Sequence, residues 1–141
     1  MNNLLVEIVS PTGKLFTGEA SGIQAPGVKG SFEVLRNHAP MIAAFEVGTL
    51  RVTSASGEKI LFATSGGFLE VMNNTVSVLA ESAELPSEID VERARKSEQR
   101  AVALLAEAGD ALDRERAQAA LDRARNRLRN AMGAVGSEQE F

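Results

Sequence analysis

"ELPSE" at residues 84–88 separates two parts of the chain that differ in composition. All four prolines and nine of the twelve glycines lie in residues 1–86, whereas residues 87–141 hold no proline, twelve alanines and 21 charged residues. Proline and glycine interrupt regular structure, and alanine is the strongest helix former. We therefore predict two domains, residues 1–86 and residues 87–141, with the joint at this stretch.

Composition limits the classes of function. The chain has 141 residues, 44% of them hydrophobic and 24% charged, which is enough to bury a core. Its net charge of -4 argues against nucleic acid as the main partner. Cysteine is absent and His38 is the single histidine, so disulfides, thiolate metal sites and histidine-rich metal centres are excluded. We expect no metal site and no required cofactor.

The sequence contains no stretch near the ~18 consecutive apolar residues that a membrane-spanning helix needs. The first ten residues, "MNNLLVEIVS", carry no basic region, and Glu7 interrupts their apolar run. We expect neither a membrane span nor a signal or transit peptide.

Short apolar or alternating runs separated by turn residues fill the first part of the chain. Strands of this length and spacing are typical of a β-sandwich or barrel. The runs are "LLVEIV" (4–9), "KLFTGE" (14–19), "SGIQAP" (21–26), "SFEVL" (31–35), "MIAAFE" (41–46), "TLRVTS" (49–54), "EKILFAT" (58–64), "GFLEVM" (67–72) and "TVSVLAE" (75–81).

Alternation along these runs predicts the side chains that fill the interior. They are Val6, Ile8, Phe32, Val34, Leu50, Val52, Phe62, Phe68, Val76 and Val78. The pair Gly66–Gly67 leads into a strand rather than a helix, so it does not match a phosphate-binding loop. We interpret the pair as a β-bulge or a tight turn.

The second part of the chain predicts an antiparallel pair of helices. Asp90 is a good N-cap for a helix that runs to about Glu107, and Gly109 is a stop signal. A second helix, capped by Asp110 or Asp113, runs to about Met132. The short break between them favours a helical hairpin.

Small apolar residues form the predicted seam of this hairpin. They are Ala94, Ala101, Leu104, Leu105 and Ala108 on the first helix, and Ala117, Leu121, Ala124, Leu128, Ala131 and Val135 on the second. Burial returns only about 0.8 kcal/mol per carbon, while ordering a residue costs about 1.5 kcal/mol. The net stability of the hairpin should therefore be small, so it could open without unfolding the sandwich.

Catalytic arrangements are missing from the pattern. A nucleophilic triad needs a histidine near a serine or cysteine, and His38 lies in a turn-like segment before Pro40. The carboxylates are scattered, with no acid–base pair among them. An enzyme is therefore the weakest of the function classes that we consider.

A basic strip is the most unusual feature of the second helix. It consists of Arg123, Arg125, Arg127 and Arg129, opposed locally only by Asp122. On a helix, positions 123 and 127 share one face and positions 125 and 129 share another. The strip is either a solvated surface or a contact for an acidic partner or a phosphate group.

Four blocks are specific in combination: "IVSPTGKLFTGEA" (8–20), "QAPGVKGSFEVLRNHAPMIAAFEVGTLRV" (24–52), "ATSGGFLEVMNNTVSVLAESAE" (63–84) and "IDVERA" (89–94). Together they resemble the epsilon subunit of bacterial F-type ATP synthase and its chloroplast and mitochondrial relatives. The resemblance covers nearly the whole chain. It implies a β-sandwich of about ten strands followed by an antiparallel two-helix hairpin.

The resemblance also implies a role and partners. The family is not catalytic: its sandwich couples the gamma subunit to the c-subunit ring at the cytoplasmic face of the cell membrane, peripherally. Its hairpin can extend along gamma toward the catalytic alpha and beta subunits and inhibit ATP hydrolysis. The contact residues implied here are His38 toward gamma, the region of Ser31, Phe32, Met41 and Ile42 toward the c ring, and Arg125 and Arg129 toward the catalytic subunits. The chain departs from the common family pattern at Ser31, Glu33 and Arg36, which changes the charge of the docking region.

Some family members bind ATP on the folded hairpin as a regulatory ligand, through a motif that here reads "IDVERA" (89–94). The implied nucleotide site comprises Glu84, Ile89, Asp90, Arg93, Ala94, Arg100, Arg123 and Arg127. In an antiparallel hairpin the arginines could gather around phosphate, for which guanidinium groups are suited. The alternatives are that Asp90 is only a cap and the arginines only a solvated surface. For the whole chain, the competing function is a stand-alone sandwich adaptor for an unrelated protein.

Overall fold

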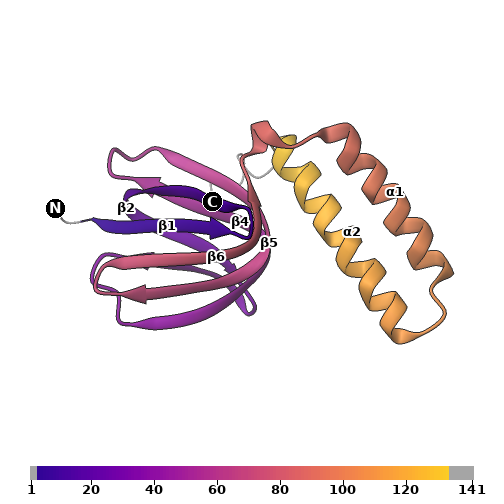
Figure 1. Ribbon diagram of the computed structural model, residues 1–141, viewed down its shortest axis with the longest axis horizontal. Helices are drawn as coiled ribbons and strands as arrows, with labels where there is room; N and C mark the ends of the chain where they lie inside the picture. Colours follow the sequence, from indigo (N-terminus) through magenta and orange to yellow (C-terminus); the bar gives the residue numbers. More distant parts are fainter. Residues whose placement is uncertain (1–2, 134–141) are drawn as a thin grey trace. The chain divides into compact units, whose positions relative to one another are not determined.

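The computed structural model describes residues 3–133 of the chain. It divides into two compact units, Met1–Leu85 and Pro86–Phe141. The first is built of strands and the second of helices, as Figure 1 shows. The predicted fold class, an all-β sandwich followed by a helical hairpin, is confirmed.

Six strands make up the described part of the first unit, rather than about ten. They are β1 (Leu4–Ser10), β2 (Gly13–Gly27), β3 (Gly30–Leu35), β4 (Met41–Ser54), β5 (Lys59–Met72) and β6 (Thr75–Glu84). The expected number was wrong because β2, β4 and β5 each run through two of the predicted short strands without a break.

The long strand β2 lets the sheet close on itself. The strand order is β1-β6-β5-β4-β2-β3, and β1 also pairs with β2. The first half of β2 pairs with β1 from Gly13 to Ala20, and its second half pairs with β3 and β4. Near Pro26, which has no N–H to donate, the β2–β4 register shifts. Figure 1 shows the strands curving around a common interior.

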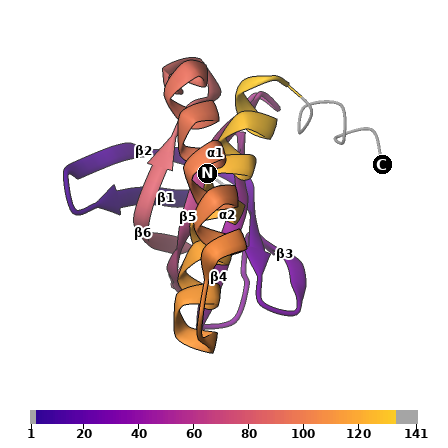
Figure 2. The same cartoon turned by 90° about the vertical axis from the view of Figure 1, so that its right-hand side faces the viewer.

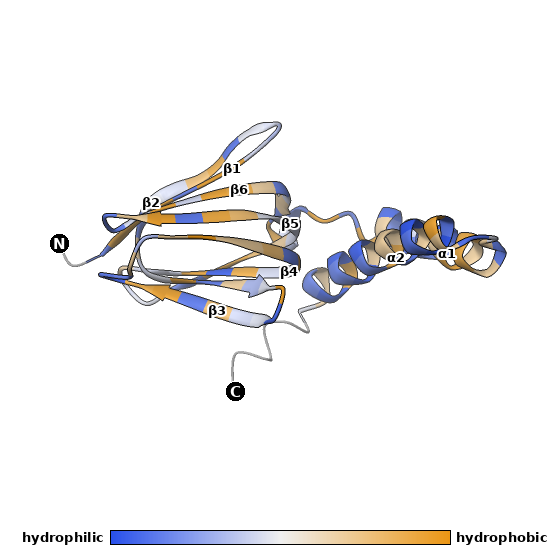
Figure 3. Ribbon diagram, turned by 90° about the horizontal axis from the view of Figure 1, so that it is seen from below, coloured by the Kyte–Doolittle hydropathy of each residue, from blue (hydrophilic) through white to orange (hydrophobic). Residues whose placement is uncertain are grey.

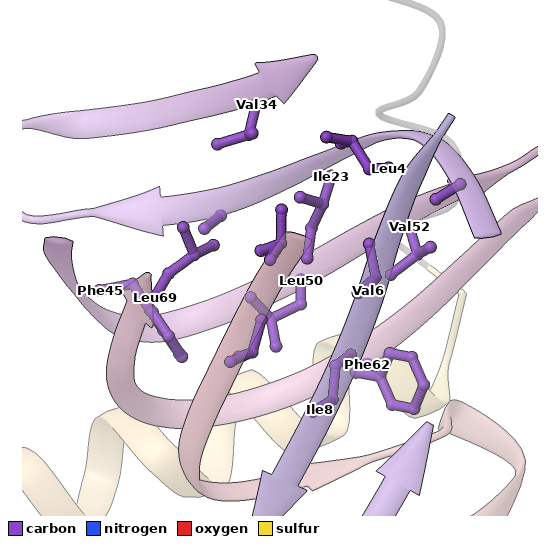
Figure 4. Packing of buried hydrophobic residues seen from close by; sticks show 14 of the residues in the cluster. Leu4, Val6, Ile8, Ile23, Val34, Phe45, Leu50, Val52, Phe62 and Leu69 are labelled. Atoms are coloured by element: carbon purple, nitrogen blue, oxygen red, sulfur yellow. The ribbon is translucent and has the colours of Figure 1, made fainter. Parts of the chain in front are cut away.

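Apolar side chains from all six strands fill this interior. Figure 4 shows Leu4, Val6 and Ile8 of β1 in this interior, together with Ile23 of β2, Leu50 of β4 and Leu69 of β5. Eight of the ten predicted core residues are buried: Val6, Ile8, Val34, Leu50, Val52, Phe62, Val76 and Val78. Phe32 is only partly buried and packs against the core.

Phe68 was predicted to point inward, and this prediction is wrong: its side chain is 57% exposed. The cause is the predicted bulge at Gly66–Gly67, where the β5–β6 register shifts. A one-residue shift moves every following side chain to the other face of the sheet. Phe62 is therefore buried before the bulge, whereas Leu69 and Val71 are buried after it.

The helical unit begins with a short 3-10 helix, η1 (Pro86–Glu88), followed by α1 (Val91–Glu107) and α2 (Ala111–Ala131). The predicted caps are confirmed. Asp90 Oδ1 accepts a hydrogen bond from the Arg93 amide at 3.1 Å, and Asp110 Oδ1 accepts one from the Asp113 amide at 2.8 Å. The two helices lie side by side in Figures 1 and 2.

The buried seam between the helices consists mainly of alanine, as predicted. Its fully buried members are Ala94, Ala101, Ala117, Leu121 and Ala124. The prediction for Leu104 was wrong, since its side chain is 58% exposed. A helix turns by about 100° per residue, so Leu104 and Leu105 cannot both face the seam, and Leu105 is the half-buried one. Val135 lies outside the described residues.

The bulge predicts a steep loss of stability for Gly67→Ala. A Cβ at this position would meet the Leu79 carbonyl oxygen and the Ala80 Cα of the adjacent strand. We expect the free energy of unfolding to fall by about 3 kcal/mol, measured by urea denaturation. Gly18→Ala in β2 is the control, because its Cβ would meet only Phe16 at an ordinary 3.4 Å contact. Equal unfolding midpoints for the two variants would contradict the role assigned to the bulge.

Candidate functional site

The predicted contact residues of the sandwich lie on two separate strands. Ser31 is exposed at the start of β3, opposite Pro26, and Phe32 packs partly into the core. Met41 also packs against the core, whereas Ile42 is 72% exposed on the other face of β4. In the sheet, β2 lies between β3 and β4. The structure therefore does not make one continuous strand surface of these four residues.

His38 lies in the loop of residues 36–40, which we call the RNHAP loop, between β3 and β4. Its amide donates a hydrogen bond to the Leu35 carbonyl oxygen at 3.2 Å. The ring Nδ1 is 2.7 Å from the Ala39 carbonyl oxygen, so the proton of this bond is on Nδ1. The ring is half-buried. It is held by its own loop, and its Nε2 is not part of this bond.

An exposed apolar surface on the outside of the sheet was not predicted from the sequence. Val9 pairs with Leu79, Leu79 with Phe68, and Phe68 with Ala44, so these four side chains form a row across β1, β6, β5 and β4. Phe68 and Leu79 are 57% and 58% exposed. We call this the outer apolar face, and it comprises Leu5, Val9, Ile42, Ala44, Phe68, Met72 and Leu79.

Large exposed apolar patches on folded domains mark binding surfaces. The row next to the apolar row holds Glu7, Ser77, Glu70 and Ile42. Leu5, Thr75 and Met72 form the row beyond it, so two carboxylates lie within the outer apolar face. Glu7 already pairs with Lys14 at 2.9 Å. The signal that could have revealed this surface is the Gly66–Gly67 bulge, because it reverses the alternation expected for Phe68. Figure 3 shows hydrophobic stretches along the strands, whereas polar segments recur along both helices.

The start of α1 brings part of the predicted nucleotide motif into the packing of the helical unit. Ile89 is buried and its amide donates to the Pro86 carbonyl oxygen at 3.3 Å. Ala94 is fully buried in the seam, and Asp90 is engaged as the cap of α1. Glu84 ends β6, in the sandwich unit. Arg93 is exposed, as are Asp90 and Glu92.

One ion pair shows the register of the two helices. Arg125 Nε of α2 lies 3.2 Å from Glu98 Oε2 of α1. In an antiparallel pair, this contact places Arg100 level with Arg123. Arg93 falls about one turn beyond Arg127, a step of roughly 4.5 Å along the axis. The four arginines therefore occupy about two turns of the hairpin.

The same four arginines lie on one side of the hairpin. Arg93 and Arg100 each precede a buried seam alanine of α1, and Arg123 and Arg127 each precede a seam residue of α2. In a pair of antiparallel helices, the residues that come directly before the seam positions of the two helices lie on the same side of the pair. We call these residues the arginine face; Arg127 is half-buried and the other three are exposed.

The Glu98–Arg125 pair occupies the opposite side. Glu98 lies about 140° around α1 from Arg93, at about 100° per residue. The Glu98 carboxylate is thus turned away from the arginine face. On the face itself, Arg100 Nη2 donates to Ser97 Oγ at 3.0 Å. Arg125 and Arg129 are exposed on other parts of α2.

Two buried polar residues of α2 were also missed by the sequence analysis. Asn126 and Asn130 are 3% and 2% exposed. Asn130 Nδ2 donates to the Asn126 carbonyl oxygen at 2.8 Å. Helix geometry puts Asn126 nearly opposite the seam residue Ala117. Nothing in the local pattern distinguishes these asparagines from residues of an exposed helix surface.

Within residues 3–133, no group of three or more histidine, cysteine, aspartate or glutamate side chains could hold a metal ion. No helix in the described part of the chain is long and apolar enough to cross a membrane.

Comparison with known proteins identifies relatives of both units. Residues 3–86 match the family model "ATP synthase, Delta/Epsilon chain, beta-sandwich domain", and residues 87–132 match the "long alpha-helix domain" of the same family. An ATP synthase epsilon chain of Salinibacter ruber is 55% identical, covering 98% of each chain. Another, from Syntrophomonas wolfei, is 40% identical over 91% of this chain and 93% of the relative.

Two solved structures share the fold. A chain in the cryo-EM structure of the Euglena gracilis mitochondrial ATP synthase, which includes F1 and the c-ring, has a TM-score of 0.78 at 22% identity. That match covers 96% of this chain and 82% of the other. A chain in the cryo-EM structure of the central stalk and c-ring of the Tetrahymena thermophila mitochondrial ATP synthase has a TM-score of 0.64 at 15% identity. That match covers 93% of this chain and 95% of the other. Both family models and the near-full-length identity of 55% show that the chain belongs to the ATP synthase delta/epsilon chain family.

Proposed function

We propose that this chain is the non-catalytic epsilon subunit of a rotary F-type ATP synthase and couples gamma to the c ring in the central stalk. The observation that carries the proposal is the 55% identity to an ATP synthase epsilon chain over 98% of each sequence. The two solved structures of the same fold come from ATP synthase assemblies whose titles name the c-ring. The subunit then sits peripherally at the cytoplasmic face of the membrane, as part of the complex.

Gamma is the proposed partner of the outer apolar face and of His38 at its border. The support is physical: an apolar row next to a row that holds two carboxylates suits a partner surface that combines apolar side chains with basic groups. The c ring is the proposed partner of the β2–β3 turn. There Val28 is 65% exposed at the tip and Ser31 follows it. Ile42, which the resemblance assigned to the c ring, lies on the outer apolar face and is reassigned to gamma.

The helical hairpin is the proposed regulatory element. Its seam of alanines buries little area per residue, which keeps the free energy that holds the hairpin closed small. In the extended state, Arg125 and Arg129 would meet acidic segments of the catalytic alpha and beta subunits and inhibit ATP hydrolysis. Extension that separates α1 from α2 must break the Glu98–Arg125 pair, whose side chains are partly exposed, so that this cost is low.

ATP is the proposed regulatory ligand of the closed hairpin. The arginine face offers four guanidinium groups within about two helical turns, with the Glu98 carboxylate turned away. Guanidinium forks bind phosphate oxygens in pairs. At a hundredfold excess over its dissociation constant, a ligand stabilises the state it binds by about 2.7 kcal/mol. ATP would therefore hold the hairpin closed and relieve inhibition.

A stand-alone adaptor is the competing function. Such a protein would use the same exposed apolar face to bind an unrelated partner. Purification of the tagged chain from membranes separates the two functions. We expect gamma and c subunits to be recovered with it; recovery of neither would exclude the stalk role.

Single cysteines test the docking orientation, and the natural sequence contains none. We expect a cysteine at Leu79 or His38 to cross-link to gamma, and one at Ser31 to cross-link to a c subunit. The measurement is mass spectrometry of the cross-linked products from assembled enzyme. Ser56, exposed in the turn after β4 at the other end of that strand from the RNHAP loop, is the control. Products from position 56 but not from 38, 79 or 31 would reverse the proposed orientation.

Removing residues 87–141 tests the inhibitory hairpin. All six strands end by Glu84, so the shortened chain keeps the sandwich and its outer apolar face. We expect the enzyme to assemble and to hydrolyse ATP at least as fast as before. Gamma must still be recovered with the shortened subunit, so that a faster rate is not due to its loss. Slower hydrolysis by a fully assembled enzyme would contradict inhibition by the hairpin.

Calorimetry on the isolated subunit tests ATP binding. We expect the Arg93→Ala, Arg127→Ala variant to bind ATP at least tenfold more weakly, because a hydrogen bond to a charged group contributes about 1.5–3 kcal/mol. Arg129→Ala removes one positive charge from another part of α2 and should leave the affinity unchanged. No heat at millimolar ATP, or equal losses in both variants, would leave Asp90 as a cap and the arginines as a solvated surface.

A further inference from the structure

Two turns that are far apart in the sequence are joined by a reciprocal pair of asparagines. The Asn37 amide donates a hydrogen bond to Asn74 Oδ1 at 2.6 Å. In return, Asn74 Nδ2 donates to Asn37 Oδ1 at 3.2 Å. Asn37 belongs to the RNHAP loop, and Asn74 to the turn between β5 and β6. We call this pair the asparagine clip.

The turn that holds the clip is itself fixed to the sheet. The Leu5 amide of β1 donates to the Asn74 carbonyl oxygen at 2.9 Å. Asn74 thus contacts β1 with its backbone and the RNHAP loop with its side chain. Because β1, β5 and β6 are neighbours in the closed sheet, Asn74 is a rigid reference point for the loop.

Backbone conformation alone does not account for the residue at position 74. Asn37, Asn73 and Asn74 have φ angles of 65°, 50° and 59°, in the left-handed region that asparagine tolerates. Among residues 3–133, however, the Asn73 side chain makes no hydrogen bond, whereas that of Asn74 makes the clip. Glycine would satisfy the backbone at either position. Only at position 74 would it remove a contact between distant segments.

The clip lies at the border of the outer apolar face. Leu5 belongs to that face and contacts Asn74 through its backbone. Met72 precedes the clipped turn, and Ile42 follows the RNHAP loop at the start of β4. His38 therefore sits on a loop that borders the face. The loop has no strand ladder of its own, and the hydrogen bonds of Asn37 and His38 hold it.

We propose that Asn74 is a positioning residue that holds the RNHAP loop in place, so that His38 and the outer apolar face form one preformed docking surface. The inference rests on the proposed function, in which gamma binds this surface. A loop ordered before binding does not have to be ordered during it, and this raises affinity. The fold has no further need of the Asn74 side chain, since the core and the strand ladders do not include it.

The test is the affinity of the full-length chain for purified gamma subunit. We expect Asn74→Gly to weaken binding about tenfold, because two hydrogen bonds that order the loop are lost. Asn73→Gly changes the neighbouring residue in the same backbone conformation and should leave affinity unchanged. Asn74→Asp should bind nearly as well as the parent, since a carboxylate oxygen still accepts from the Asn37 amide and the turned Asn37 amide group can donate to it.

Hydrogen exchange detects the clip without the partner. The Asn37 amide should exchange slowly in the parent chain, in Asn73→Gly and in Asn74→Asp, and fast in Asn74→Gly. Thermal unfolding should show equal midpoints for the two glycine variants. A mutant cycle then shows whether Asn74 acts through the loop: in a His38→Ala background, Asn74→Gly should cost clearly less affinity than in the parent.

The outcomes separate this inference from the proposed function. If the parent chain does not bind gamma, both are overturned. If the parent binds and Asn74→Gly binds equally well, the clip has no role in docking while the stalk function stands. Equal losses from both glycine variants would assign the effect to the backbone of the turn. The expected pattern is loss of affinity in Asn74→Gly alone, with the loss much reduced by His38→Ala.

Discussion

The β-bulge at Gly66–Gly67 is the constraint on which the surface of the sandwich depends. The adjacent strand approaches so closely that a Cβ at Gly67 would meet the Leu79 carbonyl oxygen. The Thr64 hydroxyl stabilises the bulge: it accepts from the Gly66 amide at 3.2 Å and donates to the Ser82 carbonyl oxygen at 2.8 Å. Beyond the bulge the two faces of β5 are exchanged, which puts Leu69 in the core and Phe68 outside. The closure of the core and the apolar surface outside it thus have the same local cause.

The parts of the fold that follow from short-range rules could be predicted. The caps Asp90 and Asp110 act on amides three residues away, and alternation identified most of the core. The parts that were missed depend on contacts between distant segments. The bulge was expected, but its effect on Phe68 requires the register of β5 against β6. The asparagine clip joins residues 37 positions apart, and no local pattern indicates such a pair.

The helical hairpin separates its charges by geometry. The arginine face is predicted by residue spacing once the two helices are antiparallel, and the Glu98–Arg125 pair shows the register that brings it together. That pair places the Glu98 carboxylate on one flank of the seam, and the arginine face lies on the other. The seam between them consists mainly of alanine, so neither flank is masked by long apolar side chains. The result is a thin element with one surface suited to anions.

The parallel pairing of β1 with β6 has a consequence for how the chain folds. Residues 5–9 pair with residues 75–79, so the first strand cannot complete its ladder until the last strand has been synthesised. Pairings between distant segments form slowly, because the loop between them must close first. The helices α1 and α2 are joined by only a few residues and need no such closure. During synthesis, the nascent chain therefore carries an open, apolar sheet edge until β6 emerges, and the helices that are made last have the shortest path to their native contacts.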